Sequence, residues 1–235
     1  MSNTETLTLP NQLGSAILYM PNNAQPKAGV IVVHEWWGLT DYAKGRAEAL
    51  ADLDYAAIAV DMYGHGKTAT DPEEAERMMN AASAEPEKLN ARFQEAKKLL
   101  AQHGNIDANR IYAIGYCFGG AVVLNQARSG TELAGVASFH GLLETDNPAQ
   151  AGNINTKVLV ATGGADPMVG PDVVADFVRE MQNADVEYRL TSFPNVKHGF
   201  TNPAATENGK KYGLPLSYDK HADVSSWNAL LDFMR

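Results

Sequence analysis

Short apolar segments alternate with amphipathic segments along the chain. Residues 29–33 (Gly-Val-Ile-Val-Val) and 157–161 (Lys-Val-Leu-Val-Ala) show almost no polar alternation, which is typical of strands that are buried on both faces. The segments between such strands have the periodicity of helices with one apolar side. This alternation predicts an α/β fold with a mostly parallel, doubly wound central sheet of about seven or eight strands flanked by helices.

The predicted elements cover most of the chain, and residues 1–235 are expected to form one domain. The predicted strands are Ser15–Met20, Ala28–Val33, Ala56–Val60, Arg110–Ile114, Gly135–Phe139, Lys157–Thr162 and Val186–Phe193. The predicted helices are Asp41–Asp52, Pro72–Ala82, Glu87–His103, Phe118–Arg128, Pro171–Asn183 and Tyr218–Met234. The stretch Thr201–Ser217 has no clear periodicity and contains Pro and Gly, so we predict a loop beside the site.

The bulk composition is that of an ordinary globular protein. Of the 235 residues, 45% are hydrophobic and 20% are charged, and the formal net charge is −9. An acidic chain is not attracted to nucleic acid or to an anionic membrane, so we expect neither as a partner. No apolar run reaches the roughly 18 residues of a membrane span. Residues 1–20 lack the basic and apolar regions of a signal peptide.

The chain has one cysteine, Cys117, so no internal disulfide forms and a reducing, cytoplasmic location is expected. Cys117 lies between an apolar strand and a predicted helix, in the sequence Gly-Tyr-Cys-Phe-Gly (residues 115–119). A strand, a Gly-x-Cys-x-Gly turn and a helix form the context of the nucleophile elbow of α/β-hydrolases, with cysteine in the usual serine position. The alternative is a buried structural cysteine.

The physical chemistry of such a turn explains the residue types around Cys117. The backbone at the tip is strained, and Gly115 and Gly119 leave room where a Cβ would clash. The helix that follows directs unpaired N–H groups and the positive end of its dipole at the site. Both features favour a thiolate and, later in a reaction, a tetrahedral oxyanion.

A thiol nucleophile needs a base, and the base needs an orienting acid. In α/β-hydrolases the acid and then the histidine follow the nucleophile along the chain, at the carboxyl ends of strands. Asp166 follows the predicted strand 157–162, and His198 follows the predicted strand 186–193. The alternative for Asp166 is a simple Asp-Pro turn. The order of the residues favours the catalytic role.

The other histidines fit the role of the base less well. His65 and His103 lie in loop or helix-end contexts, and His221 lies in or near the last predicted helix. His140 ends a predicted strand but precedes Asp166, so we place it in the wall of the pocket rather than in the triad.

Residues 34–38 (His-Glu-Trp-Trp-Gly) end the predicted strand 28–33. They lack the second histidine of the His-Glu-x-x-His zinc motif, and no other cluster has metal-ligand spacing, so we expect no metal and no cofactor. In the hydrolase topology this loop supplies one oxyanion N–H, and the residue after the nucleophile supplies the other. These positions are Trp36 and Phe118. The alternative is that the two adjacent tryptophans belong to the core, with one packed inward.

Together these residues resemble the dienelactone hydrolase family of α/β-hydrolases. The matching pieces are residues 32–39 (Val-Val-His-Glu-Trp-Trp-Gly-Leu), 61–64 (Asp-Met-Tyr-Gly), 115–120 (Gly-Tyr-Cys-Phe-Gly-Gly), 163–167 (Gly-Gly-Ala-Asp-Pro) and 198–200 (His-Gly-Phe). They span most of the chain in the order of the family. The resemblance implies the α/β-hydrolase fold, a Cys117–His198–Asp166 triad and a carboxymethylenebutenolidase-like hydrolase of ester bonds.

The resemblance also implies roles outside the triad. In the family, the glutamate at the position of Glu35 lies near the thiol until substrate rearranges the pair, so we expect a resting thiol less reactive than a protease cysteine. The alternative for Glu35 is a capping carboxylate. The named enzymes of the family bind a substrate carboxylate with two arginines. Arg77 lies in the segment that carries the first of these arginines in the family. The alternative for Arg77 is a surface charge paired with Glu73. Asn202 occupies the position of the second arginine, so the resemblance does not imply true dienelactone specificity.

The leading hypothesis is a hydrolase of small carboxylic esters or lactones that passes through a thioester at Cys117. The predicted substrate-binding residues are Arg77, Trp37, Tyr63, Phe200 and Asn202, and Trp36 and Met168 also shape the pocket. One alternative is a thioesterase or acyltransferase on the same triad. Another is a non-catalytic binding protein on a hydrolase scaffold. A monomer or a weak homodimer is expected.

Overall fold

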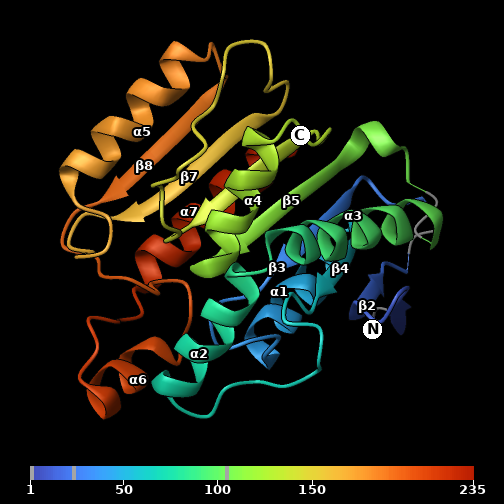
Figure 1. The fold of residues 1–235 in the computed structure, drawn as a ribbon, viewed down its shortest axis with the longest axis horizontal. Coiled ribbons are helices and arrows are strands. Elements are labelled where there is room, and N and C mark those ends of the chain that lie inside the picture. The colour runs from blue at the N-terminus through green and yellow to red at the C-terminus, as the bar shows by residue number, and fades with distance from the viewer. Residues whose placement is uncertain (1–2, 23–24, 104–105) are drawn as a thin grey trace. The chain divides into compact units, whose positions relative to one another are not determined.

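The computed structural model describes residues 3–22, 25–103 and 106–235. Over this range the strands form one sheet in the order β1-β2-β4-β3-β5-β6-β7-β8. They are β1 (Asn3–Leu9), β2 (Gly14–Met20), β3 (Gly29–Val33), β4 (Ala56–Val60), β5 (Ile111–Tyr116), β6 (Gly135–Phe139), β7 (Lys157–Gly163) and β8 (Tyr188–Phe193). The helices are α1 (Asp41–Asp52), α2 (Pro72–Ser83), α3 (Pro86–His103), α4 (Phe118–Arg128), α5 (Pro171–Asn183), α6 (Ala205–Tyr212) and α7 (Lys220–Phe233), with a 3₁₀ turn at Ala108–Arg110 (Figure 1). The predicted α/β class is confirmed.

The chain divides into two compact units, an N-terminal unit of residues 1–114 and a C-terminal unit of residues 115–235. That residues 1–235 form a single domain stays a prediction. Among the helices of the described residues, none is both long and apolar enough to cross a membrane.

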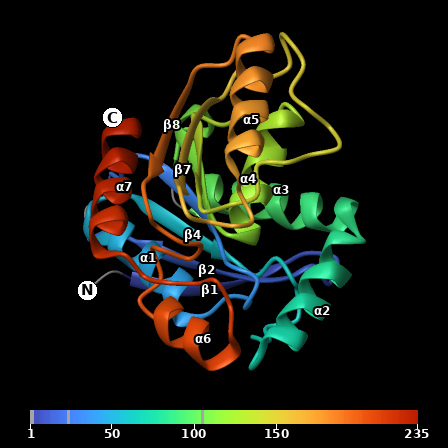
Figure 2. The same cartoon turned by 90° about the vertical axis from the view of Figure 1, so that its left-hand side faces the viewer.

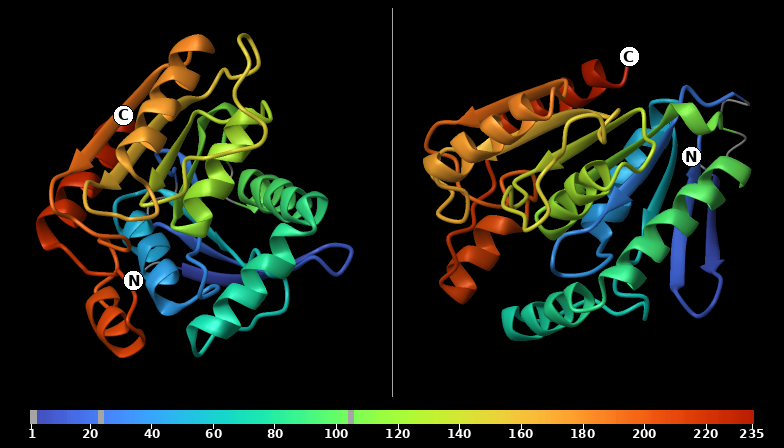
Figure 3. Two further views of the ribbon diagram at one scale, coloured as in Figure 1. Left: turned by 60° about the vertical axis from the view of Figure 1, so that its left-hand side comes forward. Right: turned by 45° about the horizontal axis from the view of Figure 1, so that its top comes forward.

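In the N-terminal unit the strands pair in both senses. β1 pairs antiparallel with β2, β2 pairs antiparallel with β4, and β3 pairs parallel with β4. Figure 3 shows the hairpin of β1 and β2 as two long blue strands. β3 and β4 are buried at every residue, and α1 and α3 pack against both of them. The uninterrupted apolar sequences of these strands therefore reflect burial on both faces, as predicted.

Strand β1 is missing from the sequence-based prediction. Its sequence, Asn-Thr-Glu-Thr-Leu-Thr-Leu, is mostly polar, and only Leu7 and Leu9 are buried. Because β1 lies at the edge of the sheet, it needs one pairing partner and little burial. An edge strand of this kind carries no apolar run by which its sequence reveals it.

In the C-terminal unit, β6, β7 and β8 pair in parallel. Helix α4 packs on β6, and α7 packs on β6 and β7. Figure 2 shows α5 and α7 on opposite sides of β7 and β8. On α5 the buried ring of Phe177 meets Tyr188 of β8 edge-on, with the ring centroids 6.5 Å apart. His221 lies in α7, as predicted.

The predicted loop Thr201–Ser217 is wrong in part, because it contains helix α6. The apolar periodicity of α6 is hidden, since only Ala205 and Gly209 are buried. A Cβ at Gly209 would lie 2.4 Å from the carbonyl oxygen of Leu216, so a glycine permits the chain to fold back closely. Gly213 ends the helix with a φ of +67°, a left-handed conformation that glycine adopts without strain.

Candidate active site

Cys117 precedes α4 directly and has a backbone φ of 54°. A positive φ is strained for a residue other than glycine and often marks a functional site. A Cβ at Gly115 would lie 2.0 Å from the carbonyl oxygen of Gly119, so the turn requires glycine there, as predicted. The backbone N–H of Cys117 donates to the carbonyl of Phe139 at 3.0 Å. The half-buried cysteine is thus held on a rigid strand–turn–helix junction.

Asp166 lies in a tight turn that follows β7. Its Oδ1 accepts a hydrogen bond from the backbone N–H of Met168 at 2.9 Å. Its Oδ2 lies 2.8 Å from Nδ1 of His198. The buried carboxylate therefore makes two contacts. One stabilises the local Asp-Pro turn, and the other pairs Asp166 with His198, as a catalytic role requires.

His198 is held by its ring and by its backbone. Its carbonyl accepts a hydrogen bond from the N–H of Ser217 at 3.1 Å, and it pairs with Leu216 in an isolated parallel β-bridge. The imidazole is buried and bound to Asp166 through Nδ1. Nε2 is buried and has no nitrogen or oxygen partner within the described residues, while a hydrogen bond with Cys117 contributes to the pKa of the ring. One ring nitrogen is therefore fixed and the other is available for proton transfer.

The electrostatic surroundings make His198 a cation at neutral pH. Burial lowers the pKa of the imidazole, but the charge of Cys117, the hydrogen bonds to Asp166 and Cys117, and the charge of Asp166 raise it, so that the pKa rises from 6.5 to about 10. A cationic neighbour stabilises a thiolate over a thiol. The structure thus brings Cys117, His198 and Asp166 together as one interacting group.

The loops after β3 and β4 are joined by His34, a residue that the sequence interpretation used only in rejecting a zinc motif. Nδ1 of His34 bonds to the carbonyl of Glu35 at 2.6 Å, and Nε2 accepts a hydrogen bond from the N–H of Met62 at 3.1 Å. Burial lowers the pKa of His34, so the ring is neutral and both nitrogens serve these loops. The hydroxyl of Tyr63 donates to the carbonyl of Trp36 at 2.7 Å. The side chain of Glu35 is buried, and its guarding role stays a prediction.

The two adjacent tryptophans differ in exposure. Trp37 is buried and Trp36 is half-buried, and their rings meet edge-on with centroids 5.0 Å apart. This difference fits the expectation that one ring packs inward. Met168, which follows the turn of Asp166, is 43% exposed. The proposed roles of these residues in the oxyanion site and in the pocket stay predictions.

Neither candidate carboxylate-binding position has a clear binding geometry. Arg77 on α2 has a side chain that is 68% exposed, and its guanidinium lies 3.8 Å from Glu74 rather than at the expected Glu73. Asn202 is buried, and its Oδ1 accepts a hydrogen bond from the N–H of Ala204 at 2.9 Å. Both side chains thus have local partners, and their binding roles stay predictions.

His140 lies closer to His198 than the sequence indicated. Its ring meets that of His198 edge-on, with centroids 5.2 Å apart, and its Nε2 lies 2.7 Å from Oγ1 of Thr201. Phe200, a predicted substrate-binding residue, is fully buried between His140 and Phe193. Thr201 was not identified from the sequence, and its position just after His198 was the only signal.

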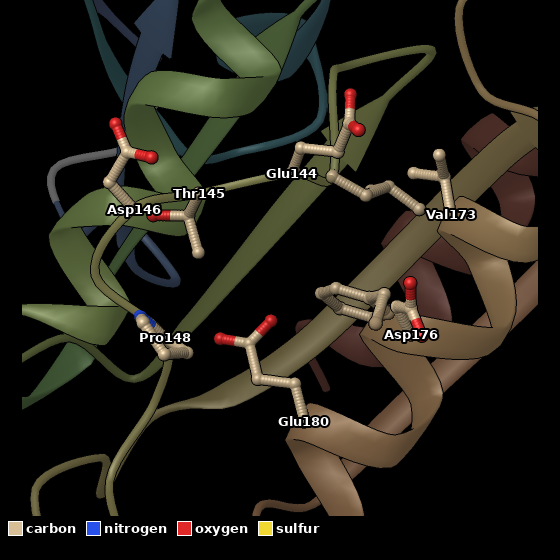
Figure 4. A pocket seen from close by; sticks show the side chains of 9 residues that line it. Glu144, Thr145, Asp146, Pro148, Val173, Asp176 and Glu180 are labelled. Carbon is tan, nitrogen blue, oxygen red and sulfur yellow. The ribbon is translucent and has the colours of Figure 1, made fainter.

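A cavity of about 510 Å³ lies in the C-terminal unit apart from these residues (Figure 4). Its lining is strongly acidic, and it contains none of the predicted site residues. The lining residues are Leu143, Glu144, Thr145, Asp146, Pro148, Val173, Asp176, Phe177 and Glu180. Glu180 is neutralised by Arg128, whose guanidinium lies 2.8 Å away, and accepts the N–H of Ala149 at 2.7 Å. The acidic cavity is therefore separate from the candidate site around Cys117.

A mostly parallel sheet of eight described strands, a strained residue between β5 and α4, and an aspartate–histidine pair after β7 and β8 define an α/β-hydrolase. The model of the dienelactone hydrolase family matches residues 15–235, and the chain belongs to this family. It is a hydrolase that acts on ester bonds.

Three known proteins that are similar to the chain match 88% or more of its length. It is 30% identical to the crystal structure of a dienelactone hydrolase-like promiscuous phosphotriesterase from metagenomic libraries, with a TM-score of 0.88 over 99% of this chain and 97% of that one. It is 27% identical to a "Probable 2-oxo-3-(5-oxofuran-2-ylidene)propanoate lactonase" of Bradyrhizobium sp, over 88% of this chain and 82% of that protein. It is 26% identical to a "Putative carboxymethylenebutenolidase" of Saccharolobus solfataricus, over 94% and 93% of the two chains.

Proposed function

We propose that this protein hydrolyses small carboxylic esters or lactones by nucleophilic catalysis. Cys117 is the nucleophile, His198 transfers protons, and Asp166 orients His198. The observation that carries the proposal is the geometry of His198. Its Nδ1 is bound to Asp166 at 2.8 Å, its Nε2 has no nitrogen or oxygen partner within the described residues, and both the charge of Cys117 and a hydrogen bond with it act on the ring. Membership of the family supports the same chemistry.

In the first half of the reaction, the thiolate of Cys117 attacks the carbonyl carbon of the substrate. A C–S bond forms and an electron pair moves onto the carbonyl oxygen. The N–H of Phe118, at the positive end of α4, is the proposed donor to this oxyanion, and the family resemblance makes Trp36 the second donor. The C–O bond then breaks, and Nε2 of His198 gives its proton to the leaving alkoxide. In a lactone the alkoxide stays attached, so the ring opens.

The second half requires His198 to change from an acid to a base. In the thioester the sulfur carries no charge. Burial lowers the pKa of His198, and the charge of Cys117 is the largest influence that raises this pKa. Because acylation removes that charge, acylation itself lowers the pKa of His198. The neutral ring then takes a proton from water, which attacks the thioester carbon. The C–S bond then breaks with its electron pair returning to sulfur, the carboxylic acid leaves, and the thiolate and the imidazolium are restored. Asp166 accepts the Nδ1–H bond throughout.

The substrate-binding residues are proposed from the family resemblance. Glu35 is the proposed guard of the resting thiol, and Arg77 is the proposed partner of a substrate carboxylate. Because Asn202 replaces the second arginine, we propose that small esters and lactones without a carboxylate are also accepted. Trp37 and Tyr63 are proposed to complete the pocket.

Incubation with p-nitrophenyl acetate, followed by an acid quench and peptide mass spectrometry, tests the proposal directly. We expect a mass gain of one acetyl group on the peptide that contains Cys117, and turnover of the ester and of simple lactones. Acyl transfer to an added alcohol in preference to water indicates an acyltransferase. Neither an adduct nor hydrolysis indicates a binding protein. Hydrolysis with the acetyl group on another residue contradicts the assignment of Cys117.

A second candidate activity is the hydrolysis of phosphotriesters, which is favoured by the similarity to the promiscuous phosphotriesterase. In such a reaction the thiolate of Cys117 attacks phosphorus in place of carbon, an S–P bond forms and the P–O bond to nitrophenolate breaks. Water activated by His198 then cleaves the S–P bond and releases the diester and the thiolate. With p-nitrophenyl diethyl phosphate we expect nitrophenol release that is slower than from the acetate ester and that is lost in Cys117→Ala. Release at the same rate from wild type and variant contradicts this second activity.

A further inference from the structure

Phe139 and His140, at the end of β6, contact both the nucleophile and the base of the proposed triad. The carbonyl of Phe139 accepts the N–H of Cys117 at 3.0 Å. The ring of His140 meets the ring of His198 edge-on, with centroids 5.2 Å apart and an interplanar angle of 66°. This two-residue segment therefore contacts both Cys117 and His198.

The backbone of His140, directly after β6, leaves the extended conformation of the strand. Its φ is 40°, in a region that residues other than glycine rarely adopt. The conformation is held by a hydrogen bond of 2.8 Å from the N–H of His140 to the carbonyl of Ala161 on β7. The side chain is fully buried. A strained backbone that buries a polar ring against a base is a feature with a cost in stability, and it calls for a functional explanation.

His140 also holds the loop that carries His198. Its Nε2 lies 2.7 Å from Oγ1 of Thr201, and both side chains are buried. Thr201 lies in the turn after His198, which is closed by a hydrogen bond of 3.0 Å from the N–H of Asn202 to the carbonyl of Gly199. The turn is therefore fixed to β6 through one side-chain hydrogen bond.

The two supports of the His198 ring act at different places. Asp166 holds Nδ1 at 2.8 Å, but one hydrogen bond leaves the ring free to swing about that contact. The ring of His140 packs against the imidazole and limits this movement. Nε2 of His198 has no nitrogen or oxygen partner within the described residues, so the packing of His140 against the ring helps to set the direction of Nε2 toward Cys117.

We propose that His140 is a positioning residue that holds Nε2 of His198 toward Cys117, through its ring contact with His198 and its hydrogen bond to Thr201. The proposal rests on the proposed triad and adds a residue that acts through His198.

Two substitutions remove the hydrogen bond with little change of shape. His140→Phe keeps a ring beside His198, and Thr201→Val replaces the hydroxyl by a methyl group. For p-nitrophenyl acetate we expect each to lower kcat about 10- to 100-fold, because a small misplacement of a catalytic group is costly, with KM changed less than about twofold. The double variant is expected to be no slower than the slower single variant, because both changes break one interaction.

The matched control is Thr156→Val. Thr156 is also a buried threonine of the C-terminal unit, and its hydroxyl bonds to the carbonyls of Leu133 and Thr131 at 3.2 and 3.3 Å. We expect this control to leave kcat unchanged per folded molecule. His140→Gln, which offers an amide to Thr201 without a ring, is expected to recover part of the loss. Circular dichroism and thermal unfolding establish that each variant is folded.

The rate of Cys117 alkylation by iodoacetamide as a function of pH supplies a readout that needs no ester turnover. If His140 positions the imidazolium, the midpoint of this profile moves to higher pH in His140→Phe and Thr201→Val but not in Thr156→Val. Unchanged kcat and an unchanged profile in the folded variants overturn the proposal, as does an equal loss in Thr156→Val. If wild type turns over no ester, the proposed function fails, and the alkylation profiles still decide the role of His140.

Discussion

Replacing Cys117 with alanine is expected to lower kcat/KM for p-nitrophenyl acetate by about 10⁶-fold, which is the scale of losing a nucleophile from a catalytic triad. Alanine has no atom that attacks the carbonyl, and His198 then has no charged partner at that position. Initial rates corrected for spontaneous hydrolysis give the measurement. No acetyl adduct is expected in the variant.

Cys117→Ser separates the nucleophile from the turn that carries it. The hydroxyl is close in size to the thiol, but its proton is far harder to remove, so we expect a slow enzyme rather than an inactive one. The backbone strain at φ 54° is shared by cysteine, serine and alanine, so the thermal midpoints of the three proteins are expected to be similar. Turnover by Cys117→Ala at the wild-type rate contradicts the assignment.

The site was predictable from the sequence where its geometry is local. Helix α4 begins and ends as predicted at Phe118 and Arg128, because strand, turn and helix follow one another without a gap. The clash that excludes a side chain at Gly115 involves Gly119, which lies within the same turn. The pairing of Asp166 with His198, 32 residues apart, was predictable because the α/β-hydrolase topology fixes the order of acid and base.

The rest depends on contacts that no short pattern encodes. His140 and Thr201 are 61 residues apart, and neither follows a motif, so the sequence placed His140 only in a pocket wall. Helix α6 was missed because its burial rests on Ala205 and Gly209, which carry almost no hydrophobic signal. Strand β1 was missed for a similar reason, because a strand at the edge of the sheet needs few buried apolar residues.

Asp166→Asn is expected to lower kcat by about 10⁴-fold, although it changes one atom of the side chain. The remaining amide oxygen can keep the hydrogen bond from the N–H of Met168, which is 2.9 Å long in the wild type. The new NH₂ group faces Nδ1 of His198 and donates to it. This reverses the hydrogen bond, places the remaining proton of a neutral ring on Nε2, and prevents that atom from accepting a proton from water. Steady-state rates of p-nitrophenyl acetate hydrolysis measure the loss.

For Asp166→Asn, the pH dependence of kcat/KM provides a second prediction, which is a shift in a definite direction. The pKa of His198 is lowered by burial and raised by Cys117 and Asp166, to about 10, so wild type keeps the imidazolium that protonates the leaving group until the pH rises through about 10. Asp166→Asn removes the charge and the acceptor that raise the pKa of His198. As the pH is raised, the residual kcat/KM of this variant is therefore expected to begin to fall at a lower pH than that of wild type. Asp172→Asn removes one charge from an exposed position at the start of α5 and is expected to change neither quantity. Equal effects of the two substitutions indicate that general charge, rather than the contact with His198, gives Asp166 its role.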